Sequence, residues 1–241
     1  QISGWTADLL GVEMVHQVGH LLRGHASRAR EIGLVEDDLL HWVDSTDAEI
    51  NDDLLQAHVA PVDSAFPVGL FAHSWGLEAA WSAGYVDSDS TLRQFLLDSI
   101  QQTGWGPIPL LNSAYRQPAR LRELDELANA FLTNSVANRA SRTQGRTFIA
   151  TASQVWPSEA MAELEDQVAS SWAHVAPFSG VAFRIIGLPY ETAQKAVLYG
   201  TARGILSAAV RLGIVGSYQA QRMQYDAGQL LDVTLKRCKD L

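Results

Sequence analysis

Apolar residues recur every three or four positions over long stretches of this 241-residue sequence, which is the spacing of one face of a helix. The pattern is clearest between Arg120 and Arg139, where charged residues fill the positions in between. Its apolar positions are Leu121, Leu124, Leu127, Ala128, Phe131, Leu132 and Val136. Its charged positions are Arg122, Glu123, Asp125 and Glu126. The sequence therefore predicts an amphipathic helix from Arg120 to Arg139 with these four charges on its outer face.

The same spacing predicts a helix from Asp89 to Gln102, with Ser90 placed to cap its N-terminus. The interruption that follows consists of Gly104, Gly106, Pro107 and Pro109. The Ala-rich stretch from Thr192 to Leu212 is predicted to be another helix, which Gly213 closes in the left-handed conformation.

A helix from Thr143 to Ser153 should end near Trp156, because the residue before Pro157 is disfavoured in the α region. Ser158 is placed to cap the next helix. Residues 181–186 fit either a strand or a short buried helix. Strand-and-turn spacing is absent elsewhere, so the sequence predicts an all-α fold, a single-domain bundle of about eight to ten helices.

No internal repeat or long linker divides residues 54–230, and we expect residues 51–241 to form one domain. Residues 1–50 differ because they are rich in glycine, histidine and acidic residues, and we expect a helical or partly flexible extension there. No window approaches the roughly 18 apolar residues of a membrane span, and no secretory signal is evident. The sequence therefore predicts a cytoplasmic protein that does not enter the membrane.

Charge and cysteine content exclude several functions. Eighteen basic and 27 acidic residues give a net charge of −9, which disfavours nucleic acid as a partner. Cys238 is the only cysteine, so an internal disulfide or a cysteine-based metal site is impossible. The sequence also lacks a phosphate-binding loop and a GxGxxG motif. No cofactor is predicted.

Two histidines offer an alternative function. His16 and His20 are four residues apart, so a helix would place both imidazoles on one face, and His25 and His41 follow. This pattern is compatible with a metal-dependent helical enzyme, although a solvated helix face explains it better. His73-Ser74 has no nucleophile elbow around Ser74, which argues against a serine hydrolase.

Arginines embedded among small and apolar residues are more informative. Arg142 and Arg146 lie where one amphipathic segment gives way to the next. Arg203 and Arg211 are eight residues apart, about two helical turns, and so share a similar face. Such arginines need carboxylate or carbonyl partners, either on a neighbouring helix or on another protein.

Three blocks in order resemble the urease accessory protein UreF family. Residues 63–78 read DSAFPVGLFAHSWGLE and match the pattern D-S-x-x-P-x-G-x-F-x-H-S-x-G-L-E. Residues 138–145 read NRASRTQG and are similar to R-x-S-R-x-x-G. Residues 207–216 read SAAVRLGIVG, are similar to S-A-A-V-R-L-x-x-x-G, and precede Gln219 and Gln221. The resemblance extends over residues 54–230.

This resemblance implies an all-α, non-catalytic protein that helps to assemble the nickel site of urease. Members of the family form homodimers and join a complex with a UreD (UreH) accessory protein and the GTPase UreG, which delivers nickel to apo-urease. The chain would then act as an adaptor that couples the GTPase cycle to nickel insertion. If the resemblance were accidental, a generic helical interaction module would remain.

The blocks also imply site residues. Pro67 and Gly69 should form a structural turn that presents Phe71 and His73 to the UreD-type partner, although a core Phe71 and a hydrogen-bonded His73 fit equally well. The expected contacts with the GTPase or a second copy are Arg142, Gln144, Arg146, Arg203, Arg211 and Gln221. No residue is predicted to be catalytic or to bind a metal.

Overall fold

The computed structural model describes residues 74–238 and 241, and every regular element in this part of the chain is a helix. Nine α-helices and one 3-10 helix, η2, follow one another there. Their bounds are α5 Leu77–Ser82, α6 Asp89–Trp105, α7 Pro107–Arg116, η2 Pro118–Arg120, α8 Leu121–Phe131, α9 Ser135–Val155, α10 Glu159–Val168, α11 Val175–Ile185, α12 Tyr190–Arg211 and α13 Ser217–Cys238. The predicted all-α fold is confirmed. The predicted boundary between residues 50 and 51 lies outside the described residues.

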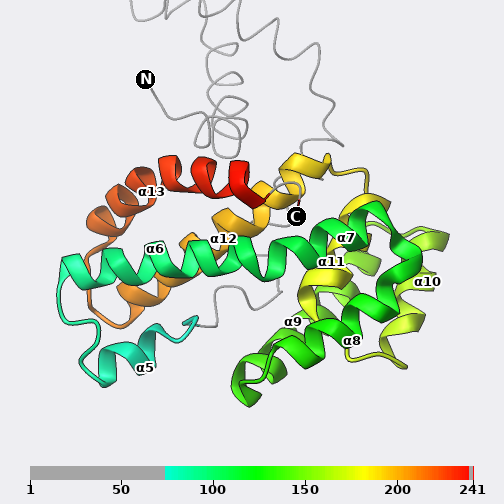
Figure 1. The fold of residues 1–241 in the computed structure, drawn as a ribbon, viewed down its shortest axis with the longest axis horizontal. Helices are drawn as coiled ribbons and strands as arrows, with labels where there is room; N and C mark the ends of the chain where they lie inside the picture. The colour runs from blue at the N-terminus through cyan, green and yellow to red at the C-terminus, as the bar shows by residue number, and fades with distance from the viewer. Residues whose placement is uncertain (1–73, 239–240) are drawn as a thin grey trace, which may run out of the picture. The chain divides into compact units, whose positions relative to one another are not determined.

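The described helices pack in two groups that share α7 (Figure 1). In one group α6, α12 and α13 pack against one another, and in the other α11 packs against α7, α8, α9 and α10. Only Gly106 separates α6 from α7, so the two helices run on from one group into the other. Among the described helices, none has both the length and the apolar composition needed to cross a bilayer.

The tightest helix contact lies between α7 and α11. A Cβ atom added to Gly180 of α11 would overlap the backbone carbonyl oxygen of Leu111 in α7 and lie 3.1 Å from the Cβ of Ala114. Leu111, Ala114 and Phe178 around this contact are fully buried. The contact therefore requires glycine at position 180, because a side chain would push the two helices apart.

Several predicted helix ends are confirmed. Helix α9 ends at Val155, with Trp156 at its C-cap position. Ser158 caps α10, since its side-chain oxygen accepts a hydrogen bond from the backbone N–H of Met161. Gly213 follows α12 with a φ of 73°, the left-handed conformation expected of it. These ends depend on local chemistry, which the sequence displays directly.

One helix cap was predicted wrongly. Ser88 caps α6 in place of Ser90, because Ser88 and Thr91 exchange hydrogen bonds in a capping box. Pro107 and Pro109 lie in the first turn of α7, where a missing N–H costs nothing. Of the two alternatives for residues 181–186, the short buried helix is confirmed, because residues 181–185 lie within α11, which ends at Ile185.

The predicted helix from Arg120 to Arg139 is two helices. The helical conformation is interrupted at residues 132–134. Asn134 then caps α9, because its side-chain oxygen accepts hydrogen bonds from the N–H groups of Val136 and Ala137. One charge of the expected outer face is also misplaced, because Asp125 is 2% exposed. Leu127 and Phe131, expected on the buried stripe, are exposed.

Candidate functional site

Several predicted residues lie outside the described part of the chain. These are the turn residues Pro67 and Gly69, the partner-binding residues Phe71 and His73, and the histidines at positions 16, 20, 25 and 41. The first block enters the described structure at Ser74. Trp75 and Gly76 there both have positive φ, 55° and 87°, and turn the chain into α5.

The structure brings together three predicted residues of the last block. Arg203 and Arg211 of α12 and Gln221 of α13 line one pocket of about 420 Å³. The rest of its lining is Leu206, Ser207, Val210, Ser217, Ala220 and Gln224. The spacing of eight residues correctly predicts that the two arginines share a face. We call this site the α12–α13 pocket; its guanidinium, hydroxyl and amide groups suit it to bind carboxylates.

The middle block forms a second basic surface. Arg139, Arg142 and Arg146 occupy positions i, i+3 and i+7 of α9, and we call them the α9 arginine face. Arg139 and Arg146 are exposed, whereas Arg142 is half-buried and stacks on Trp172, with its Cζ 4.7 Å from the ring centroid. Gln144, predicted to bind a partner, is 7% exposed and is not part of this surface.

Near the α9 arginine face, His174 connects α8, α9 and the turn before α11 through hydrogen bonds. Its imidazole is fully buried, with Nδ1 3.0 Å from Ser141 Oγ of α9 and Nε2 3.3 Å from Asn129 Oδ1 of α8. Asn129 Oδ1 also accepts a hydrogen bond from the side-chain amide of Asn138, so Nε2 must be the donor. The Ser141 hydroxyl then donates to Nδ1, and the neutral ring is fully hydrogen-bonded.

Burial is the main cause that lowers the pKa of His174 from its ordinary value. Nearby Asp125 opposes this shift, and the positive charges of Arg142 and Arg146 reinforce it. The imidazole is therefore a neutral, structural group, because charging it would require a cation to form without water beside two other cations.

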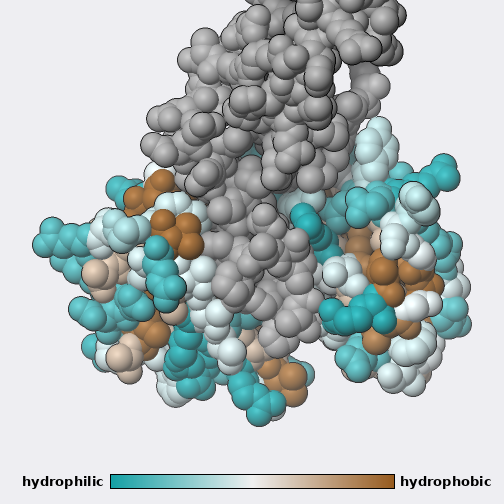
Figure 2. Space-filling view, turned by 180° about the vertical axis from the view of Figure 1, so that it is seen from behind, coloured by the Kyte–Doolittle hydropathy of each residue, from teal (hydrophilic) through white to brown (hydrophobic). Residues whose placement is uncertain are grey.

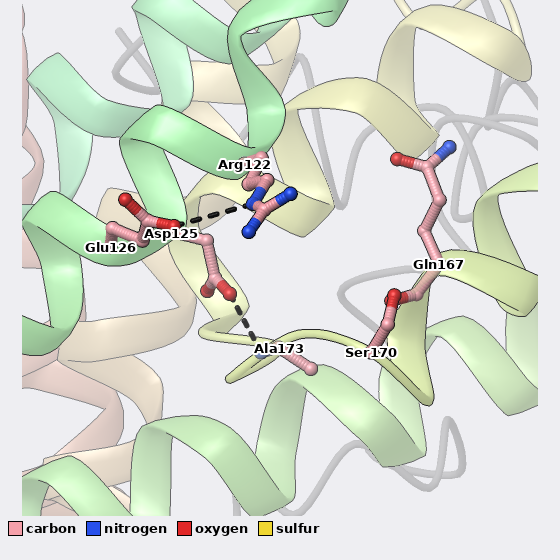
Figure 3. Close-up of polar contacts among 6 residues, drawn as sticks. All are labelled: Arg122, Asp125, Glu126, Gln167, Ser170 and Ala173. Carbon is pink, nitrogen blue, oxygen red and sulfur yellow. Dashed lines mark hydrogen bonds and ion pairs between the residues drawn. The ribbon is translucent and has the colours of Figure 1, made fainter.

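Asp125 holds the start of α11 (Figure 3). Its two carboxylate oxygens accept hydrogen bonds from the backbone N–H groups of Ala173, at 3.1 Å, and His174, at 2.8 Å. Ala173 has a φ of 62°, and its carbonyl oxygen would overlap a Cβ atom placed on Gly145 of α9. The glycine of the middle block therefore allows α9 to contact this turn, and the carboxylate fixes the turn from the other side.

Large hydrophobic side chains also reach the surface at the end of α8 and the start of α9. Leu127 and Phe131 at the end of α8 and Val136 at the start of α9 are each more than half exposed, and we call them the apolar corner. Val136 precedes Arg139 by one helical turn. Figure 2 shows that on one face of the molecule exposed hydrophobic residues gather in small groups between hydrophilic ones.

The described residues supply binding surfaces and structural polar groups. Among them, no group of three or more His, Cys, Asp or Glu side chains is arranged to hold a metal ion. The sequence patterns did not identify His174, Asp125 or Trp172. The signal that could have identified Asp125 is a charged residue falling between Leu124 and Ala128 on the buried stripe of α8.

Comparisons with known proteins give one consistent answer. A family model described as UreF matches residues 86–228. The chain is 32% identical to urease accessory protein F of Oryza sativa subsp. indica over 199 residues, which are 80% of this chain and 76% of that protein. Identity to urease accessory protein F of Arabidopsis thaliana is 35% over 184 residues, 73% of this chain and 76% of that protein. The urease accessory protein UreF of Rhodopseudomonas palustris (strain BisB5) is 32% identical over 165 residues, 66% of this chain and 68% of that protein.

Proposed function

The chain belongs to the UreF family of urease accessory proteins, and from this we propose that it acts in urease maturation as a non-catalytic scaffold. In this role it binds a UreD (UreH)-type accessory protein and a UreG-type GTPase, and the complex delivers nickel, its cargo, to apo-urease in the cytoplasm. The chain forms a homodimer and couples the GTPase cycle to nickel insertion.

The structural observation that supports partner binding is the α12–α13 pocket. It gathers Arg203, Arg211 and Gln221 from two helices at an accessible site, although 18 positions separate the first from the last along the chain. Guanidinium groups bind carboxylates bidentately, which suits recognition of acidic side chains on a partner. The buried polar groups His174 and Asp125 also support a non-catalytic role, because their hydrogen bonds hold helices together.

Complex assembly tests the proposal. Size-exclusion chromatography with light scattering should show a dimer alone and a larger complex with UreD-type and UreG-type proteins, with and without nickel and a GTP analogue. Arg211→Ala should weaken that complex because Arg211 lines the pocket. Arg122→Ala is the matched control, since Arg122 lies in α8 with 90% of its side chain exposed. Failure of the unsubstituted chain to join either partner would contradict the scaffold role.

A further inference from the structure

The arginines of the α9 arginine face have no ion-pair partner within the described part of the chain. Some other described cations do have one: Arg93 pairs with Asp226, and Arg120 pairs with Glu123. A helix rises about 1.5 Å per residue, so the three arginines are spaced roughly 4.5 and 6 Å apart along α9. They present a row of positive charge on a chain whose net charge is −9.

The central arginine is held in place. Trp172 supports its guanidinium, and no described residue accepts a hydrogen bond from it; its Nε atom is buried without a partner. The backbone next to Trp172 is fixed, because Trp172 immediately precedes the turn at Ala173. Asp125 holds this turn through a hydrogen bond, and Gly145 contacts it. A guanidinium fixed in this way loses little conformational entropy when it binds a carboxylate.

From this geometry we propose that the α9 arginine face, with Trp172, is a docking surface for an acidic segment of a partner protein. Carboxylates on one face of a partner helix, at positions i, i+3 or i+4, and i+7, would meet the three guanidinium groups. This surface is distinct from the α12–α13 pocket, because α9 packs in the group around α11 and the pocket lies between helices of the other group (Figure 1).

The surroundings favour a protein over a nucleic acid. Val136 of the apolar corner lies one helical turn before Arg139, and protein interfaces combine an apolar centre with arginine and aromatic side chains. One face of Trp172 is covered by Arg142, so a base cannot stack on that face. The net charge of −9 also repels a long polyphosphate chain more strongly than a short acidic peptide.

Fluorescence anisotropy with a labelled oligoglutamate peptide and the full chain tests the proposal. The unsubstituted chain should bind in low salt, and the double variant Arg139→Ala/Arg146→Ala should weaken binding by about tenfold or more. Arg142→Lys should also weaken it, because lysine keeps the charge but loses the stacked fork. The control is the double variant Lys236→Ala/Arg237→Ala, an equal charge change at exposed residues of the last turn of α13, which should leave binding unchanged.

Three outcomes would overturn the proposal. The first is no binding of oligoglutamate by the unsubstituted chain, and the second is an equal loss of binding in Lys236→Ala/Arg237→Ala, which would indicate diffuse electrostatics. The third is tighter binding of an oligonucleotide of equal charge that the same arginine substitutions abolish, since this would assign the surface to phosphates. Circular dichroism must show that each variant is folded. The anisotropy experiment contains no urease component, so its result does not depend on whether the proposed role in urease maturation is correct.

Discussion

At the scale of single residues, His174 makes stability depend on pH. Burial lowers its pKa in the folded chain, whereas in the unfolded chain the pKa returns to about 6.5. Below that pH the unfolded state therefore binds a proton that the folded state does not, which favours unfolding. We expect the free energy of unfolding contributed by His174 to be fully present above pH 6.5 and to fall as the pH drops toward the lower folded pKa.

Urea denaturation of the unsubstituted chain and of His174→Gln, at several pH values between about 7.5 and 5, measures this effect. Glutamine cannot take up the proton, so the pH dependence of the variant should be flatter, even though the variant is less stable overall. Equal pH dependence in the two proteins would assign acid sensitivity to other histidines and remove His174 as its source.

Gly145 is the second residue whose role is specific. A methyl group there would overlap the backbone carbonyl of Ala173, and backbone cannot move aside as a flexible side chain can. We expect Gly145→Ala to lower the free energy of unfolding by about 1–3 kcal/mol, although alanine favours helix at an unconstrained site. Gly216→Ala is the control in the same denaturation experiment, because a Cβ there meets nothing within 4 Å. Equal stability of the two variants would show that α9 can shift freely.

At the scale of elements, one carboxylate joins α8 to the start of α11. Asp125→Ala removes the acceptor for two buried backbone N–H groups, and we expect a loss of about 2–3 kcal/mol in the free energy of unfolding. Glu126→Ala, on the neighbouring residue, removes only the exposed ion pair with Arg122 and should cost less than about 0.5 kcal/mol. Thermal and chemical denaturation of the two variants would measure the difference. Similar small losses would mean that water replaces the Asp125 carboxylate.

The same elements show how far the sequence could predict the fold. Periodicity correctly identified α6 and α12, and local chemistry correctly placed the Ser158 cap. Periodicity missed the break between α8 and α9, because Leu132 and Val136 continue the apolar spacing across the break. Val136 is nevertheless exposed. A period reports which positions are apolar, but only the packed structure decides which of them are buried.

The candidate site likewise has features that the sequence could predict and features that it could not. The shared face of Arg203 and Arg211 follows from spacing within one helix, so the sequence could predict it. The partners of His174 lie 33 and 45 residues away in the chain, in helices whose packing no local pattern specifies. The stacking of Arg142 on Trp172 likewise depends on the position of the loop after α10.

At the scale of the whole described molecule, α11 and α7 connect the two groups of helices. Helix α11 packs against α8, α9 and α10 in one group, and α7 also contacts α12 in the other. Strain at the α7–α11 contact should therefore spread to both groups, whereas strain at a helix end remains local. Gly180 lies at this contact, and Asn134 lies at such an end.

We therefore expect Gly180→Ala to lower the free energy of unfolding by about 1–3 kcal/mol, because its Cβ would overlap the Leu111 carbonyl. Native-state hydrogen exchange should then show reduced protection in α9 and α13 together. Asn134→Ala, which removes a cap at a cost of about 1 kcal/mol, should reduce protection only in the first turn of α9. If Gly180→Ala loosened α9 and left α13 unchanged, the two groups would be separate folding units, and α7 would be a linker between them.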